Sequence, residues 1–194
     1  SIREYIRNFI MSKLETNTID TVSGTTNLTI GSTNSSTVTF ENGAVTGHMY
    51  PAFEARLSSD QTISDDTLTK INLNEEVFDT DSAYDNSTNY RFTPQVAGKY
   101  FVYWVVCGIA SSNNVLNSNG FIYKNGSQYN GANILGNSAI SGGSTTAIAS
   151  VIMNGSSDYL EFYLKVDAAS GAVRADHDFS GGNTTYAGAY RIGA

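Results

Sequence analysis

The sequence predicts an all-β protein: a sandwich of two sheets, preceded by a short N-terminal helix and a β-rich stalk. Its 194 residues include 12 Tyr, 9 Phe and only 2 Pro, a mixture that suits many short strands. Charged residues make up 15%, below the usual quarter, and the polar remainder is Ser, Thr, Asn and Gly, which form turns. From residue 51 onward, short apolar runs alternate with turn clusters, as in a protein built of strands.

Residues 1–14 are predicted to form a helical anchor. The apolar side chains that recur at helical spacing are Ile2, Ile6, Phe9 and Ile10. Because so short a helix is marginal alone, its apolar stripe must pack on another surface. A partner chain or a socket on a larger particle would serve, and a helix folded back onto its own head is the alternative.

Residues 15–50 are predicted to form a stalk rich in Thr, Ser and Asn. Leu28 with Ile30, and Val38 with Phe40, are short period-2 fragments followed by turn clusters. One chain of this composition buries too little apolar surface to order itself, whereas three chains wound together would each contribute an apolar row to a shared axis. A flexible linker is the alternative interpretation.

Residues 51–194 are predicted to form a head domain, since the chain length suits one domain with an appendage. The Asn125-Gly126 pair predicts a tight hairpin turn, because these residues adopt two positive φ angles at low cost. The expected strands are Ala52–Leu57, Lys70–Phe78, Tyr90–Thr93, Gly98–Ile109, Gly120–Lys124, Thr146–Met153, Tyr159–Val166 and Thr185–Ile192.

The longest expected strand is apolar on both faces. A strand of this kind must be covered twice, and in a sandwich about 10 Å thick the second cover is expected to be a neighbouring subunit. The residues assigned to core or subunit packing are Tyr100, Val102, Trp104 and Val106. Cys107, the only cysteine, is interpreted as a buried small hydrophobe.

Several partners are not expected. The net charge of −7 would repel a phosphate backbone, which argues against nucleic acid. No apolar run reaches the length of about 18 residues that predicts a membrane span, so membrane insertion is not expected. Charged residues interrupt the segment Ile2–Leu14, so no secretion signal is expected either.

Catalysis is not expected. His48 and His177 are the only histidines, and a Ser-His-Asp site needs a base beside a nucleophile. Asp176 and Asp178 flank His177, but neighbouring residues of a strand point to opposite faces, and no Gly-x-Ser-x-Gly motif presents a serine. His177 is therefore interpreted as an exposed loop residue. Hydrolysis of a polysaccharide by paired carboxylates ranks far behind a non-enzymatic role.

Two sets of residues are candidate binding sites. Asp79, Asp81 and Asp85 offer the carboxylates that calcium prefers; a solvated turn is the favoured alternative, and no other cofactor is expected. Around the hairpin, side chains suited to stacking on and hydrogen bonding with a carbohydrate or protein surface are Tyr123, Tyr129, Asn130 and Asn133. Ordinary cross-strand packing of the tyrosines is the alternative there.

The head resembles the globular head of complement C1q. The similarity is carried by Tyr84-Asp85 with Thr88, by Phe92 followed by Gly98-Lys-Tyr100, by Val151–Gly155 with Asp158–Leu160, and by Tyr186–Ile192. The resemblance covers residues 51–194 and implies a two-sheet jelly roll of the C1q/TNF type that forms compact homotrimers.

The segment Leu14–Gly31 resembles N-terminal segments of structural proteins of tailed phages, marine ones in particular. With the head type and the absence of a secretion signal, this resemblance implies a virion protein made in the host cytoplasm. We expect a trimeric fibre or spike whose N-terminus binds other virion proteins and whose head contacts a host surface glycan or protein. A capsid decoration or head-fibre protein with a structural role is the alternative.

Overall fold

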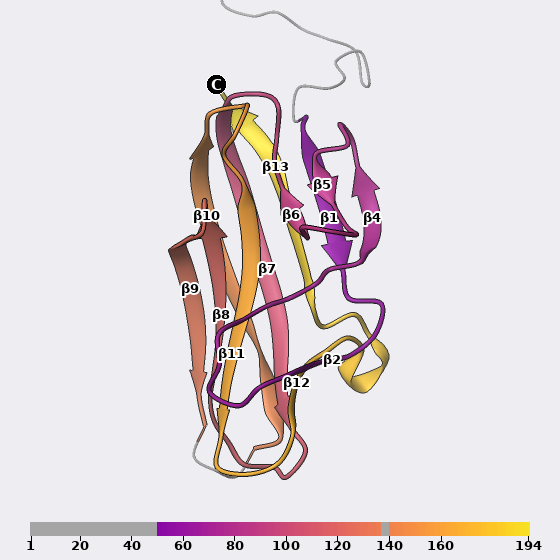
Figure 1. The fold of residues 1–194 in the computed structure, drawn as a ribbon, viewed down its shortest axis with the longest axis vertical. Helices are drawn as coiled ribbons and strands as arrows, with labels where there is room; N and C mark the ends of the chain where they lie inside the picture. Colours follow the sequence, from indigo (N-terminus) through magenta and orange to yellow (C-terminus); the bar gives the residue numbers. More distant parts are fainter. Residues whose placement is uncertain (1–49, 137–139) are drawn as a thin grey trace, which may run out of the picture. The chain divides into compact units, whose positions relative to one another are not determined.

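The computed structural model describes residues 50–136 and 140–194 (Figure 1). The predicted anchor, with Ile2, Ile6, Phe9 and Ile10, and the predicted stalk up to residue 49 lie outside the described residues. In the described part the secondary structure consists of antiparallel strands and one 3-10 turn, η1 (Phe179–Gly181). The predicted all-β sandwich of two sheets is confirmed there.

The first sheet, sheet A, is centred on the long strand β7. Strand β10 pairs with one edge of β7 over its length, while β13 and β12 pair, one after the other, with the opposite edge. Its seven strands are β1 (Ala52–Arg56), β2 (Gln61–Ile63), β4 (Glu75–Asp79), β7 (Gly98–Ala110), β10 (Gly142–Met153), β12 (Val173–Asp176) and β13 (Tyr186–Gly193).

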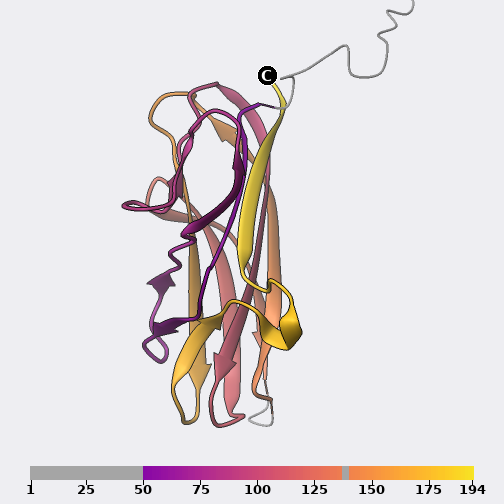
Figure 2. The same cartoon turned by 90° about the vertical axis from the view of Figure 1, so that its right-hand side faces the viewer.

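The second sheet, sheet B, faces the first (Figures 1 and 2). Its central strands are β11 and β8, and β9 forms one edge. Its six strands are β3 (Thr69–Lys70), β5 (Tyr84–Asp85), β6 (Arg91–Phe92), β8 (Val115–Lys124), β9 (Ser127–Leu135) and β11 (Leu160–Ala168). After β7 the chain forms β8 and β9 in sheet B, returns to sheet A for β10, and crosses again for β11. These crossovers build the predicted jelly roll.

The core between the sheets follows from alternation along the strands. In β11 the even-numbered residues from Leu160 to Val166 are at most 1% exposed, as expected of a half-buried strand. Aromatic rings fill one end of the core: Phe53 stacks on Tyr84 and Phe92 at centroid distances of 4.6 and 4.5 Å. Burial of these large side chains is the main favourable contribution to folding.

The predicted strand Lys70–Phe78 is wrong as a single element. Strand β3 ends at Lys70 and β4 begins at Glu75. Between them, Ile71 and Leu73 are fully buried, while the Asn72 N–H donates to the side chain of Gln61 instead of to a strand. Alternating apolar residues therefore predicted the burial of this segment correctly but not its pairing.

The hairpin turn at Asn125-Gly126 is confirmed, with φ angles of +52° and +75°. The strand that follows it, β9, was not predicted, because its sequence SQYNGANIL lacks a clear apolar alternation. The short strands β2, β5 and β12 were not predicted either. Two predicted strands are longer than expected, since β8 begins at Val115 and β10 at Gly142.

Gly98 is expected to tolerate no side chain. It opens β7 at a φ of +152°, and a Cβ atom there would lie 2.4 Å from the carbonyl oxygen of Gly193. Because such overpacking forces the backbone to move, Gly98→Ala should lower the free energy of unfolding by about 1–3 kcal/mol. Urea denaturation measures the change, and the exposed neighbour variant Lys99→Ala is the control; equal stability of the two variants would contradict the prediction.

Candidate functional site

The outward face of sheet A carries a row of apolar side chains along its central strand. Strand β7 alternates between the two sides: Tyr100, Val102, Trp104 and Val106 are 0% exposed and point into the core. Phe101, Tyr103 and Val105 point the other way and are partly exposed in the single chain. The structure thus separates the doubly apolar strand into a core row and an outward row.

Neighbouring strands extend this outward row into a patch. Ile148 of β10 lies opposite Tyr103 and is 55% exposed. On the other side, the β13 residue Tyr190 lies opposite Phe101, with ring centroids 5.4 Å apart. We call this surface the sheet A patch; it consists of Phe101, Tyr103, Val105, Ile148, Tyr186 and Tyr190. Contiguous apolar surface of this kind marks an interaction site.

One polar group lies at the margin of the sheet A patch. The Tyr103 hydroxyl donates a hydrogen bond of 2.5 Å to the Glu54 carboxylate. Burial and this acceptor raise the pKa of Tyr103 well above its usual value, so the hydroxyl stays protonated at neutral pH. The bond satisfies the polar end of the ring, while its carbon atoms contribute to the patch.

The outward face of sheet B has a different chemistry, with aromatic rings among amides. Phe121 lies between Tyr163 and Gly131 in register, and the rings of Tyr123 and Tyr163 are 4.3 Å apart. A shallow hollow of about 210 Å³ opens on this face. We call it the sheet B hollow; it is lined by Asn119, Phe121, Gln128, Gly131, Ala132 and Asn133.

The four predicted contact residues near the hairpin divide into two groups. Tyr123 and Asn133 belong to the outward face of sheet B. Tyr129 and Asn130 instead donate to the β10 carbonyl oxygens of Ser150 and Ile148, at 2.9 and 2.7 Å. At the β-bulge between Ile122 and Tyr123, Tyr129 has no partner in β8 and Asn130 lies opposite the buried Ile122. The structure therefore does not bring the four side chains together.

Charges on the outward face of sheet B are paired with one another. Glu161, only 5% exposed, lies 3.2 Å from the Lys70 ammonium and 3.5 Å from the Arg91 guanidinium. Tyr163 donates to the same carboxylate, and burial together with this negative charge raises the pKa of Tyr163 to about 12. The phenol is therefore neutral at physiological pH.

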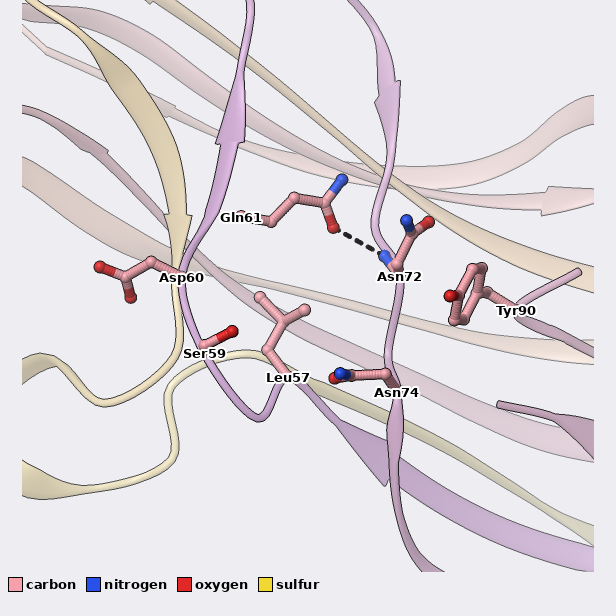
Figure 3. Close-up of a pocket in the computed structure, with 7 residues that line it drawn as sticks. All are labelled: Leu57, Ser59, Asp60, Gln61, Asn72, Asn74 and Tyr90. Atoms are coloured by element: carbon pink, nitrogen blue, oxygen red, sulfur yellow. Dashed lines mark hydrogen bonds between the residues drawn. The ribbon is translucent and has the colours of Figure 1, made fainter. Parts of the chain in front are cut away.

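A second hollow of about 210 Å³ lies beside the loop after β1 (Figure 3). We call it the loop hollow; it is lined by Leu57, Ser59, Asp60, Gln61, Asn72, Asn74 and Tyr90. The Gln61 amide accepts from the Asn72 N–H and donates to the Lys70 carbonyl, and the Asn74 side chain bonds to Ser58. Figure 3 shows the Asp60 carboxylate turned away from the hollow.

Asp60 instead joins a charged cluster that the sequence did not reveal. Its Oδ1 lies 2.8 Å from Nδ1 of His177, and Asp178 lies 3.3 Å from the same nitrogen. The other Asp60 oxygen bonds to Arg174 at 2.9 Å. The buried Asp176 also bonds to Arg174, so the two carboxylates that flank His177 have different surroundings. The cluster joins residues 117 positions apart, a separation that no local motif could indicate.

The His177–Asp60 pair should titrate visibly. The hydrogen bond to Asp60 raises the pKa of His177 above 6.5. Because the pKa of His177 is higher in the folded state, protonated His177 stabilises the fold fully at pH values below the unfolded-state pKa of about 6.5. This stabilisation is lost as the pH rises through the folded-state pKa. We expect Asp60→Asn to lower the His177 midpoint, measured by NMR in a His48→Gln background. An unchanged midpoint would contradict the pairing.

The candidate calcium ligands are not brought together. The Asp79 carboxylate accepts the N–H groups of Asp81 and Tyr84. Asp85 accepts from the N–H groups of Thr88, Ser87 and Asn89, which hold its pKa well below the usual range. Within residues 50–136 and 140–194, the one group of three convergent metal-ligating side chains is Asp60, His177 and Asp178.

Comparison with solved structures identifies the fold. The Eiger TNF of S. frugiperda is 11% identical, with 74% of this chain and 93% of that chain covered at a TM-score of 0.53. Murine APRIL is 10% identical, with 73% and 98% covered at a TM-score of 0.54. These likenesses confirm the C1q/TNF-type jelly roll. No family model and no curated protein matches the sequence, and no helix among the described residues is long and apolar enough to cross a membrane.

Proposed function

We propose that this protein is a non-enzymatic virion appendage, a homotrimeric fibre or spike assembled through the sheet A patch. The sheet A patch is the observation that supports the proposal, because in an isolated sandwich the aromatic and aliphatic side chains of the patch are in contact with water. Burying apolar surface is favourable by about 25 cal/mol per Å². A cyclic trimer provides the cover in a closed arrangement that does not grow into a filament.

The particle context rests on the sequence. The resemblance of Leu14–Gly31 to phage structural proteins and the apolar stripe of residues 1–14 both support an N-terminus bound to other virion proteins. In such an arrangement the head points away from the particle. Covering the outward face of sheet A leaves the outward face of sheet B accessible, which suits contact with a host surface.

Two measurements test the proposal. Light scattering of the full chain at micromolar concentration should give three copies of 20.8 kDa, about 62 kDa; a folded monomer would contradict the trimer. Antibody against the head should label intact virions. Label confined to the capsid shell, with no loss of host adsorption after antibody treatment, would favour the decoration role over the fibre role.

A truncation tests the anchor. Deleting residues 1–14 should leave a folded trimer, because the sheet A patch lies in the head, and should prevent incorporation into virions. Incorporation is measured by blotting purified particles. Normal incorporation would place the anchor elsewhere in the chain, and loss of the trimer would make the N-terminal segment an assembly element.

A further inference from the structure

We infer that the sheet B hollow binds a neutral oligosaccharide. Sugars present hydroxyl groups at their edges and C–H groups on their faces, so their sites combine amide hydrogen bonds with an aromatic surface. The hollow offers the ring of Phe121 with the amides of Asn119, Gln128 and Asn133. The inference deepens the proposed host contact, but it does not require the trimer.

The aromatic surface depends on a close approach between β8 and β9. Phe121 lies directly across from Gly131, and a Cβ atom on that residue would lie 2.5 Å from the Phe121 ring. Glycine thus lets the ring lie over the neighbouring strand. Tyr123 and Tyr163 lie on the same face of sheet B, with ring centroids 4.3 Å apart, so aromatic side chains are present beyond the hollow itself.

The amides around the ring are positioned and accessible. Asn119 donates to the Asn117 side chain at 2.6 Å, and Asn117 donates to Asp167 at 3.1 Å, so this relay orients Asn119. The side chains of Gln128 and Asn133 are exposed and make no hydrogen bond to any other residue that the structure describes. They are able to donate to and accept from sugar hydroxyls.

Pairing of the nearby charges favours a neutral ligand. Glu161 is compensated by Lys70 and Arg91, and Lys165 by Asp66 at 2.7 Å. A charged sugar would find no free opposite charge among the residues lining the hollow, all of which are uncharged. The net charge of −7 further disfavours acidic polysaccharides.

The loop hollow has a similar volume, but fewer of its amide groups are available to bind a ligand. Its Gln61 and Asn74 amides are already bonded to Asn72, Lys70 and Ser58, and Tyr90 is its only aromatic residue. The side chain of Asn72 is exposed and lies between Gln61 and Tyr90 in the view of Figure 3. Asn72→Ala therefore makes the same chemical change as Asn133→Ala in the other hollow and is its matched control.

The full chain is tested on an array of neutral hexose and N-acetylhexosamine oligosaccharides beside acidic ones, and calorimetry is then run on the glycans that bind. We expect binding to a neutral oligosaccharide. Phe121→Ala and Asn133→Ala should each weaken it at least about 10-fold, the loss of one well-made contact, while Asn72→Ala changes it less than about 2-fold. Asn133→Ala, at an exposed position, keeps the test valid if the Phe121 variant folds poorly.

Three results would overturn the inference: no neutral glycan bound at millimolar concentration, binding of acidic glycans alone, or binding lost in Asn72→Ala rather than in Asn133→Ala. Light scattering on the same samples separates this failure from that of the proposed assembly. A monomer that binds the sugar would contradict the trimer and support the saccharide site, and a trimer that binds none would do the reverse.

Discussion

Replacing Trp104 by alanine is expected to lower the free energy of unfolding by about 3–5 kcal/mol. Trp104 is fully buried, its indole packs 5.4 Å from the Phe162 ring, and its Nε1 donates to the Tyr163 carbonyl at 3.1 Å. The substitution removes both contacts from the space between the sheets. Because the site lies between two paired strands, the surroundings are poorly placed to close the cavity.

Thermal denaturation measures this effect. A domain of this size loses roughly 2–4 °C of Tm per kcal/mol, so Trp104→Ala should melt roughly 6–20 °C below the wild type. Trp104→Phe is the control, since it keeps an aromatic ring and should lose much less. A Tm for the alanine variant within a degree of the wild type would show that packing of Trp104 in the core does not stabilise the fold.

The fold was predictable where a local pattern determines burial. Strand β7 was identified because Tyr100–Cys107 is an uninterrupted apolar and aromatic run, and the Asn125-Gly126 turn because its two positive φ angles favour that pair. The break after Lys70 was missed because buried side chains in irregular backbone alternate just as strand residues do. The order of strands in the sheets depends on pairs distant in sequence, such as β1 with β13. It could be expected only from the resemblance of the head to complement C1q.

The candidate sites were less predictable, for a related reason. Tyr129 and Asn130 were grouped with Tyr123 and Asn133 because all four lie near the hairpin in sequence, but a single bulge changes which face the next residues occupy. Phe121 and Gly131, which both line the sheet B hollow, become neighbours only through the β8–β9 register. Asp60 could not be linked to His177, because 117 residues separate them.

The trimer proposal leads to the second large expected effect: Ile148→Asp should convert the trimer into a folded monomer of 20.8 kDa. Ile148 is 55% exposed in the single chain, so the change should leave the sandwich itself intact. In the trimer it would place three carboxylates in apolar interfaces, where an unpaired charge costs several kcal/mol. Light scattering reads out the mass, and circular dichroism confirms that the monomer is folded.

The matched control is Leu135→Asp. Leu135 is 78% exposed and lies on β9 opposite Asn117, on the outward face of sheet B. The same aliphatic-to-carboxylate change there should leave the mass near 62 kDa, three times the chain mass, because that face stays in water. If Leu135→Asp dissociated the trimer and Ile148→Asp did not, the assembly surface would have to be the outward face of sheet B, and the saccharide site proposed there would be covered.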